Sequence, residues 1–91
     1  MKFWQVLKET IYENKTVVSI DSSWKSLEDA EKRVEQIKEQ FQKKFYYYPN
    51  IQWEKKFVKY YDSSCTRYTT IEDVTKDFDP ISIEIHEKLL V

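Results

Sequence analysis

The chain contains no glycine among its 91 residues. Glycine adopts positive φ without steric cost and lets the backbone approach a bound phosphate closely. Phosphate-cradling loops and glycine-dependent active-site turns are therefore not expected. With a single histidine, His86, and a single cysteine, Cys65, the chain also lacks a recognisable catalytic constellation. We expect neither enzyme activity nor a cofactor.

The composition is typical of one folded domain, which we expect to span residues 1–91. The chain is 41% hydrophobic and 34% charged, unlike a disordered polyelectrolyte or a membrane protein. No apolar run approaches the roughly 20 residues that span a bilayer, so no membrane contact is expected. Met1–Glu9 leaves no room for the apolar core of a secretory signal, and a lone cysteine forms no internal disulfide. These features favour a cytoplasmic protein.

One long helix is predicted from Leu27 to Phe45. Its apolar residues recur every three or four positions and form a single stripe: Leu27, Ala30, Val34, Ile37 and Phe41. Ser26 followed by Asp29 is a helix-start signal, because the hydroxyl accepts from an early backbone N–H and the carboxylate favours the positive end of the helix. Pro49 prevents continuation. The stripe is too short for a coiled coil, so we expect the helix to pack on a sheet.

Strands are predicted on both sides of this helix. Lys2–Tyr12 and Thr16–Asp21 are rich in β-branched and aromatic residues and indicate a hairpin. After the helix, an extended segment carries apolar residues on one face: Ile51, Trp53, Phe57 and Tyr61.

The C-terminal part of the chain is predicted to be mainly strand. A polar turn at Asp62–Thr66 precedes Tyr68–Val74, which fits either a strand or a short helix capped by Thr70. Alternating isoleucines then predict a final strand over Ile81–His86. The order is ββαβββ or ββαββ. Both define an α+β two-layer sandwich with a mainly antiparallel sheet and one helix on one face.

Two segments resemble parts of known small proteins. The hairpin followed by the helix start Asp21–Glu31, together with the closing strand Ile81–Glu87, resembles small uncharacterised proteins common in phages and mobile elements. The segment Phe41–Tyr61 departs from their shorter versions. The resemblance implies no catalytic residues. It implies a context in which small proteins bind and inhibit host enzymes or defence systems.

Charge is unevenly distributed along a chain whose net charge is −1. The segment Phe41–Thr69 contains six basic and two acidic residues, whereas Thr70–Val91 contains two basic and six acidic ones. Within the basic part, lysines alternate with aromatic side chains. This pattern gives the candidate contact residues Tyr46, Tyr47, Tyr48, Trp53, Lys55, Lys56 and Lys59.

Basic and aromatic side chains in one segment fit two kinds of ligand. They fit a protein interface, where tyrosine and tryptophan dominate binding energy, or a single-stranded nucleic acid, whose bases stack on the rings. The C-terminal acids would repel phosphate, so the sequence favours a non-enzymatic protein-interaction module. The expected partner is a host protein, bound by occlusion as an inhibitor would bind it. Nucleic-acid binding is the alternative. A long edge strand or an open sheet face also permits a homodimer.

The residues with metal-binding or nucleophilic chemistry look isolated in the sequence. His86 is predicted to be exposed on the last strand. Cys65 is predicted to lie in a polar turn beside Arg67, a neighbour that would favour a lowered thiol pKa. The spacing gives no reason to pair Cys65 with His86. A structural zinc site needs about four nitrogen or sulfur ligands, and the two side chains available predict no metal site.

Overall fold

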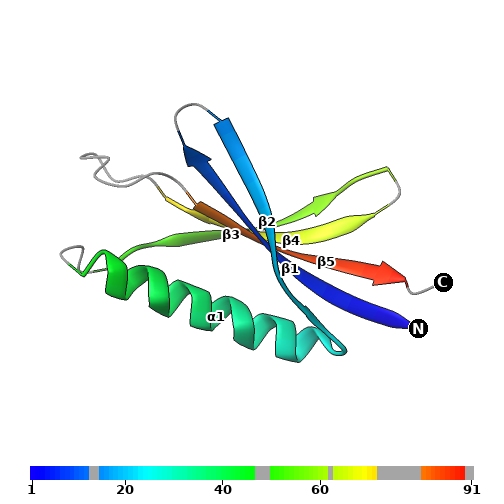
Figure 1. The fold of residues 1–91 in the computed structure, drawn as a ribbon. Helices are drawn as coiled ribbons and strands as arrows, with labels where there is room; N and C mark the ends of the chain where they lie inside the picture. Colours follow the sequence, from blue (N-terminus) through cyan, green and yellow to red (C-terminus); the bar gives the residue numbers. More distant parts are fainter. Residues whose placement is uncertain (13–14, 47–49, 62, 72–80, 90–91) are drawn as a thin grey trace.

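The computed structural model describes residues 1–12, 15–46, 50–61, 63–71 and 81–89. A hairpin is followed by one helix and three further strands (Figure 1). The elements are β1 (Lys2–Tyr12), β2 (Lys15–Trp24), α1 (Leu27–Lys44), β3 (Trp53–Lys59), β4 (Ser64–Thr70) and β5 (Ile81–Leu89). The predicted α+β fold is confirmed, and ββαβββ is the observed order of the two that the sequence allows.

The five strands form one antiparallel sheet in the order β2-β1-β5-β4-β3. The first and last strands of the fold, β1 and β5, pair in the middle, and each end of the sheet is a hairpin. The strands fan out in Figure 1 because the sheet is twisted. Strands β2 and β3 are therefore the two edges.

Helix α1 begins and ends close to the predicted residues. The backbone N–H of Asp29 donates to Ser26 Oγ over 3.1 Å, which is the predicted cap. Lys44 is the last helical residue, and Phe45 is the C-cap. Lys43 and Lys44 in the last turn suit the negative end of the helix.

The core forms where the helix stripe meets the middle of the sheet. Its buried members are Val6, Ala30, Val34, Ile37, Tyr68, Ile83 and Ile85. Three tryptophans, Trp4, Trp24 and Trp53, pack against its margin. At the start of the helix Leu27, predicted to be part of the buried stripe, is 42% exposed.

The strand register divides the sheet residues between two faces. Val6, Ile85, Thr66 and Phe57 are paired in sequence across four strands and so point to the same side as the core. We call this the helix-side face. The neighbouring row contains residues that point the other way, to what we call the far face: Ile20, Leu7, Glu84, Arg67 and Lys56.

One helix covers only part of the helix-side face. A helix is about 10 Å wide and strands lie about 4.8 Å apart, so a single helix covers roughly two or three strands. Over the described residues the backbone of α1 approaches β1, β2 and β5, and side chains alone bridge the distance to β3 and β4. We call the part of this face on β3 and β4, which the helix backbone does not reach, the uncovered half, although side chains still bury Tyr68 on β4.

Some local predictions for the strands are wrong. Strand β2 continues to Trp24, beyond the predicted end at Asp21. The predicted turn Asp62–Thr66 contains the start of β4, which runs from Ser64 to Thr70. Thr66 suits a half-buried strand as well as a turn, and its pairing with Ile85 on β5 places it in a strand. Of the predicted segment Tyr68–Val74, residues 68–70 are strand and Ile71 is not. Residues 72–74 lie outside the described residues, as does most of the alternative short helix.

Candidate functional site

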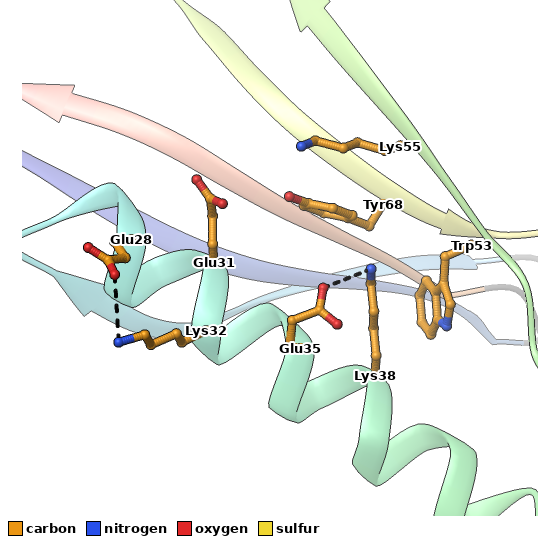
Figure 2. A pocket seen from close by; sticks show the side chains of 8 residues that line it. All are labelled: Glu28, Glu31, Lys32, Glu35, Lys38, Trp53, Lys55 and Tyr68. Atoms are coloured by element: carbon orange, nitrogen blue, oxygen red, sulfur yellow. Dashed lines mark hydrogen bonds and ion pairs between the residues drawn. The ribbon is translucent and has the colours of Figure 1, made fainter.

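A groove of about 370 Å³ separates α1 from β3 and β4 on the uncovered half (Figure 2). The helix contributes one wall and the two strands the other. The lining residues are Glu28, Glu31, Lys32, Glu35, Lys38, Trp53, Lys55 and Tyr68. The groove therefore combines two aromatic rings with charges of both signs.

Two lysines lie over the ring of Tyr68 in this groove. Lys38 Nζ is 4.6 Å from the ring centroid and Lys55 Nζ is 5.7 Å from it. Lys38 also donates to Glu35 Oε1 over 3.2 Å. Burial raises the pKa of Tyr68, and the carboxylates of Glu31 and Glu35 raise it further, so the phenol stays neutral at physiological pH. These contacts connect side chains of α1, β3 and β4 across the groove.

The predicted contact residues on β3 are divided between the two faces. Trp53, Lys55 and Lys59 lie on the helix-side face, because side chains alternate along a strand. Lys56 lies on the far face and pairs with Glu54 over 3.5 Å. Trp53 is half-buried and contacts the ring of Phe41 edge-on, with 5.6 Å between centroids.

The predicted tyrosines follow the end of α1. Tyr46 is 81% exposed. Tyr47 and Tyr48 lie outside the described residues. The structure thus brings Trp53, Lys55 and Lys59 together and places Tyr46 at the adjacent end of the helix.

Phe57 is a candidate contact residue that the sequence analysis missed. It lies between Lys55 and Lys59 on the helix-side face and is 71% exposed. A second groove, of about 180 Å³, is lined by Phe57 together with Trp4 and Leu27. The sequence pattern placed Phe57 on the same face as the other apolar residues of its segment, which is the helix-side face. At β3 the helix does not cover that face, so Phe57 is exposed.

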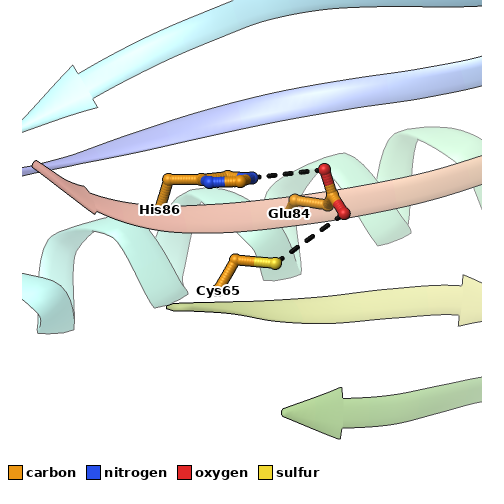
Figure 3. Close-up of side chains that lie close together, drawn as sticks. All are labelled: Cys65, Glu84 and His86. Carbon is orange, nitrogen blue, oxygen red and sulfur yellow. Dashed lines mark hydrogen bonds and ion pairs between the residues drawn. The ribbon is translucent and has the colours of Figure 1, made fainter. Parts of the chain in front are cut away.

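Cys65, Glu84 and His86 form a polar cluster on the far face (Figure 3). Cys65 on β4 is the cross-strand partner of His86 on β5, and Glu84 precedes His86 by two residues on the same face. Cys65 Sγ lies 3.8 Å from Glu84 Oε2, and His86 Nε2 lies 3.2 Å from Glu84 Oε1. Arg67 Nε donates to Glu84 Oε2 over 2.7 Å. No spacing signal predicted this cluster, because it depends on the register of two distant segments.

The surroundings of this cluster correct two predictions. Burial raises the pKa of the Cys65 thiol, and the neighbouring Glu84 carboxylate raises it further, whereas a lowered value was predicted. A raised thiol pKa disfavours the thiolate, which is the nucleophilic form of cysteine. Burial also opposes ionisation of Glu84, but the hydrogen bonds with Arg67 and His86 outweigh it and hold the pKa of Glu84 below its ordinary value. His86, predicted to be exposed, has only 16% of its side chain exposed.

Comparison with known proteins found no matching family model, no matching curated protein and no matching solved structure. Within the described residues, no helix has the length and apolar character needed to cross a membrane.

Proposed function

We propose that this protein is a non-enzymatic interaction module that binds another protein through the uncovered half of its sheet. The contact centre is the β3 strip, which we define as Trp53, Lys55, Phe57 and Lys59. The observation that carries the proposal is Phe57, a large apolar side chain left 71% exposed on the core-facing side of the sheet. Contact surfaces are typically built around such aromatic residues.

The charges of the uncovered half favour a protein over a polyanion. Lys55 and Lys59 flank Phe57 on the same face, so the complementary surface is an apolar pocket bordered by carboxylates. The facing helix wall carries Glu28, Glu31 and Glu35 together with Lys32 and Lys38. With Lys55 on the opposite wall the positive and negative charges balance, so the groove offers no continuous positive track for a phosphate backbone.

Occlusion is the mechanism that fits this surface. Contact residues on a paired strand are held in a rigid sheet, so little ordering entropy is lost on binding. A module of this kind blocks the partner's site by covering it. The resemblance to small phage and mobile-element proteins supports a host protein as the partner and inhibition as the outcome.

Single-stranded nucleic acid is the second candidate, favoured by the alternation of aromatic and basic side chains along the β3 strip. Bases would stack on Trp53 and Phe57 while Lys55 and Lys59 contact phosphates. Replacing both lysines with alanine would then flatten the dependence of affinity on salt. Lys56→Ala is the matched control, because Lys56 lies on the far face. An unchanged salt slope in the double variant excludes this candidate.

The experiment that tests the proposal compares two substitutions of exposed apolar residues. Phe57→Glu alters the β3 strip, whereas Ile20→Glu alters the far face at a residue that is 63% exposed. Each tagged variant captures proteins from nuclease-treated lysate of the source organism, and mass spectrometry quantifies what is retained.

We expect a protein retained in near-equal amount by the wild type and by Ile20→Glu, and lost with Phe57→Glu. Equal retention by both variants would place the contact elsewhere. A partner that disappears with nuclease would favour the nucleic-acid candidate.

A further inference from the structure

We propose that Cys65, Glu84 and His86 bind a Zn²⁺ ion on the far face of the sheet. The three side chains supply one sulfur, one oxygen and one nitrogen donor, which is a set that zinc accepts. The sequence analysis expects no metal because only two nitrogen or sulfur donors are present. The fold adds the Glu84 carboxylate as a third donor.

The spacing of the donor atoms fits a tetrahedral ion. Bonds of about 2.0–2.3 Å at tetrahedral angles place neighbouring donors roughly 3.3–3.8 Å apart. The imidazole Nε2 lies 3.2 Å from Glu84 Oε1, and the thiol lies 3.8 Å from the other oxygen, Oε2, which also accepts from Arg67. One donor atom from each residue can be chosen so that all three lie within 4.8 Å of one another. The Glu84 carboxylate must turn one oxygen toward both other donors to close the site around one ion.

The sheet holds these donors in advance of binding. Strands β4 and β5 are paired to strands on both sides, so neither is an edge. Cys65 is 2% exposed and Glu84 is 6% exposed, which restricts their rotamers. The imidazole of His86 is partly exposed and gives the ion a route from solvent.

Arg67 orients the carboxylate, and the thiolate and carboxylate together balance the charge of the ion. Its Nε binds Glu84 Oε2, so the second oxygen, Oε1, is the one directed at His86. Its Nη2 donates to the hydroxyl of Tyr60 over 3.0 Å. On binding, the Cys65 thiol loses one proton to solvent as the sulfur–zinc bond forms. Zn²⁺ with a thiolate and a carboxylate is neutral overall, so the nearby guanidinium is tolerated. A water molecule completes four-coordination.

The test uses untagged, reduced, metal-free full-length protein titrated with Co²⁺ as a spectroscopic substitute for Zn²⁺. Cobalt bound to a thiolate gives a sulfur-to-metal charge-transfer band, and Cys65 is the only cysteine able to produce one. We expect the band to saturate at one ion per chain and to disappear when Zn²⁺ is added. Cys65→Ser should remove the band.

Two further variants show whether the other donors take part. Glu84→Gln and His86→Gln should each weaken Co²⁺ binding at least tenfold. Glu87→Gln is the matched control, because Glu87 lies on β5 and points to the helix-side face, and its affinity should equal that of the wild type. Zn²⁺ should also raise the midpoint of thermal unfolding of the wild type but not of Cys65→Ser.

Absence of the band at saturating Co²⁺ would overturn the proposal without any variant. Unchanged affinity in both Glu84→Gln and His86→Gln would also overturn it, because the thiol alone would then be responsible. The site lies on the face opposite the β3 strip, so either proposal can fail without the other.

Discussion

At the residue scale, the carboxylate of Asp21 connects the hairpin to the helix. Val6 pairs with Ser22 and the next residue, Leu7, pairs with Ile20, so Asp21 has no partner in the β1–β2 pairing and lies at an irregularity. Arg33 on α1 donates to it through Nε over 2.7 Å and through Nη2 over 2.9 Å, and Lys8 lies 3.4 Å away. The hydrogen bonds from Arg33 hold the pKa of Asp21 well below its ordinary value.

Asp21→Asn should therefore destabilise the fold in a pH-dependent way. We expect a loss of about 1–3 kcal/mol at pH 7, because Arg33 loses a charged partner that is 8% exposed. A carboxyl group whose pKa is lowered by folding stabilises the protein at pH values above its ordinary pKa. This contribution is lost as the pH falls from about 4 toward the lower pKa of the folded state. Urea denaturation at several pH values measures the difference between variant and wild type, which should shrink on acidification. A constant difference across pH would contradict this assignment.

Single residues also mark the limit of sequence reasoning. Ser26 was identified as the helix cap because its partner is three residues away, within the reach of a local pattern. Cys65 and His86 were not paired, because their contact depends on which strands become neighbours and in which register. Burial of Cys65, and hence the direction of its pKa shift, follows from the same nonlocal pairing.

At the scale of elements, the start of α1 depends on its cap. Ser26→Ala removes the acceptor for the Asp29 N–H and should cost about 1 kcal/mol of unfolding free energy. Ser19→Ala, at an exposed residue of β2, is the control and should change stability by less than about 0.5 kcal/mol. Urea denaturation gives both values. Equal effects of the two substitutions would show that the cap contributes nothing.

Strand β2 is an edge with apolar side chains in solvent. Val17, Val18 and Ile20 are 51%, 54% and 63% exposed, and within the described residues β1 is the only strand paired with β2. Long exposed apolar edges promote strand-to-strand association. We expect wild-type protein to associate reversibly as its concentration rises and Val18→Glu to remain monomeric. Sedimentation velocity distinguishes these outcomes, and a wild type that stays monomeric would contradict the expectation.

At the scale of the whole molecule, the described residues form one helix packed on a sheet of five strands. The helix was predicted from its stripe of Ala30, Val34 and Ile37, and the two-layer architecture followed from it. The strands that the helix covers were not predictable from the sequence. Strand β3 follows α1 in the chain, but in the sheet it is the edge farthest from the β1–β2 hairpin, on which the helix packs. The sequence placed Phe57 on the apolar face of its segment, and only the strand order shows that this face is uncovered at β3 and leaves the side chain exposed.

The two faces of the sheet therefore have different chemistry. The helix-side face carries the core and, beyond it, the exposed aromatic and basic side chains of the β3 strip. The far face carries the cluster of Cys65, Glu84 and His86 around Arg67. The proposed contact surface and the proposed metal site therefore lie on opposite faces of the sheet.

The central claim is that the β3 strip binds a partner protein, and calorimetry of the captured partner against two alanine variants tests it most directly. Phe57→Ala should weaken binding by about 2 kcal/mol, roughly thirtyfold, with unfolding free energy nearly unchanged because the side chain is exposed. Ile20→Ala should bind as the wild type does. Unaltered affinity in Phe57→Ala would contradict the account.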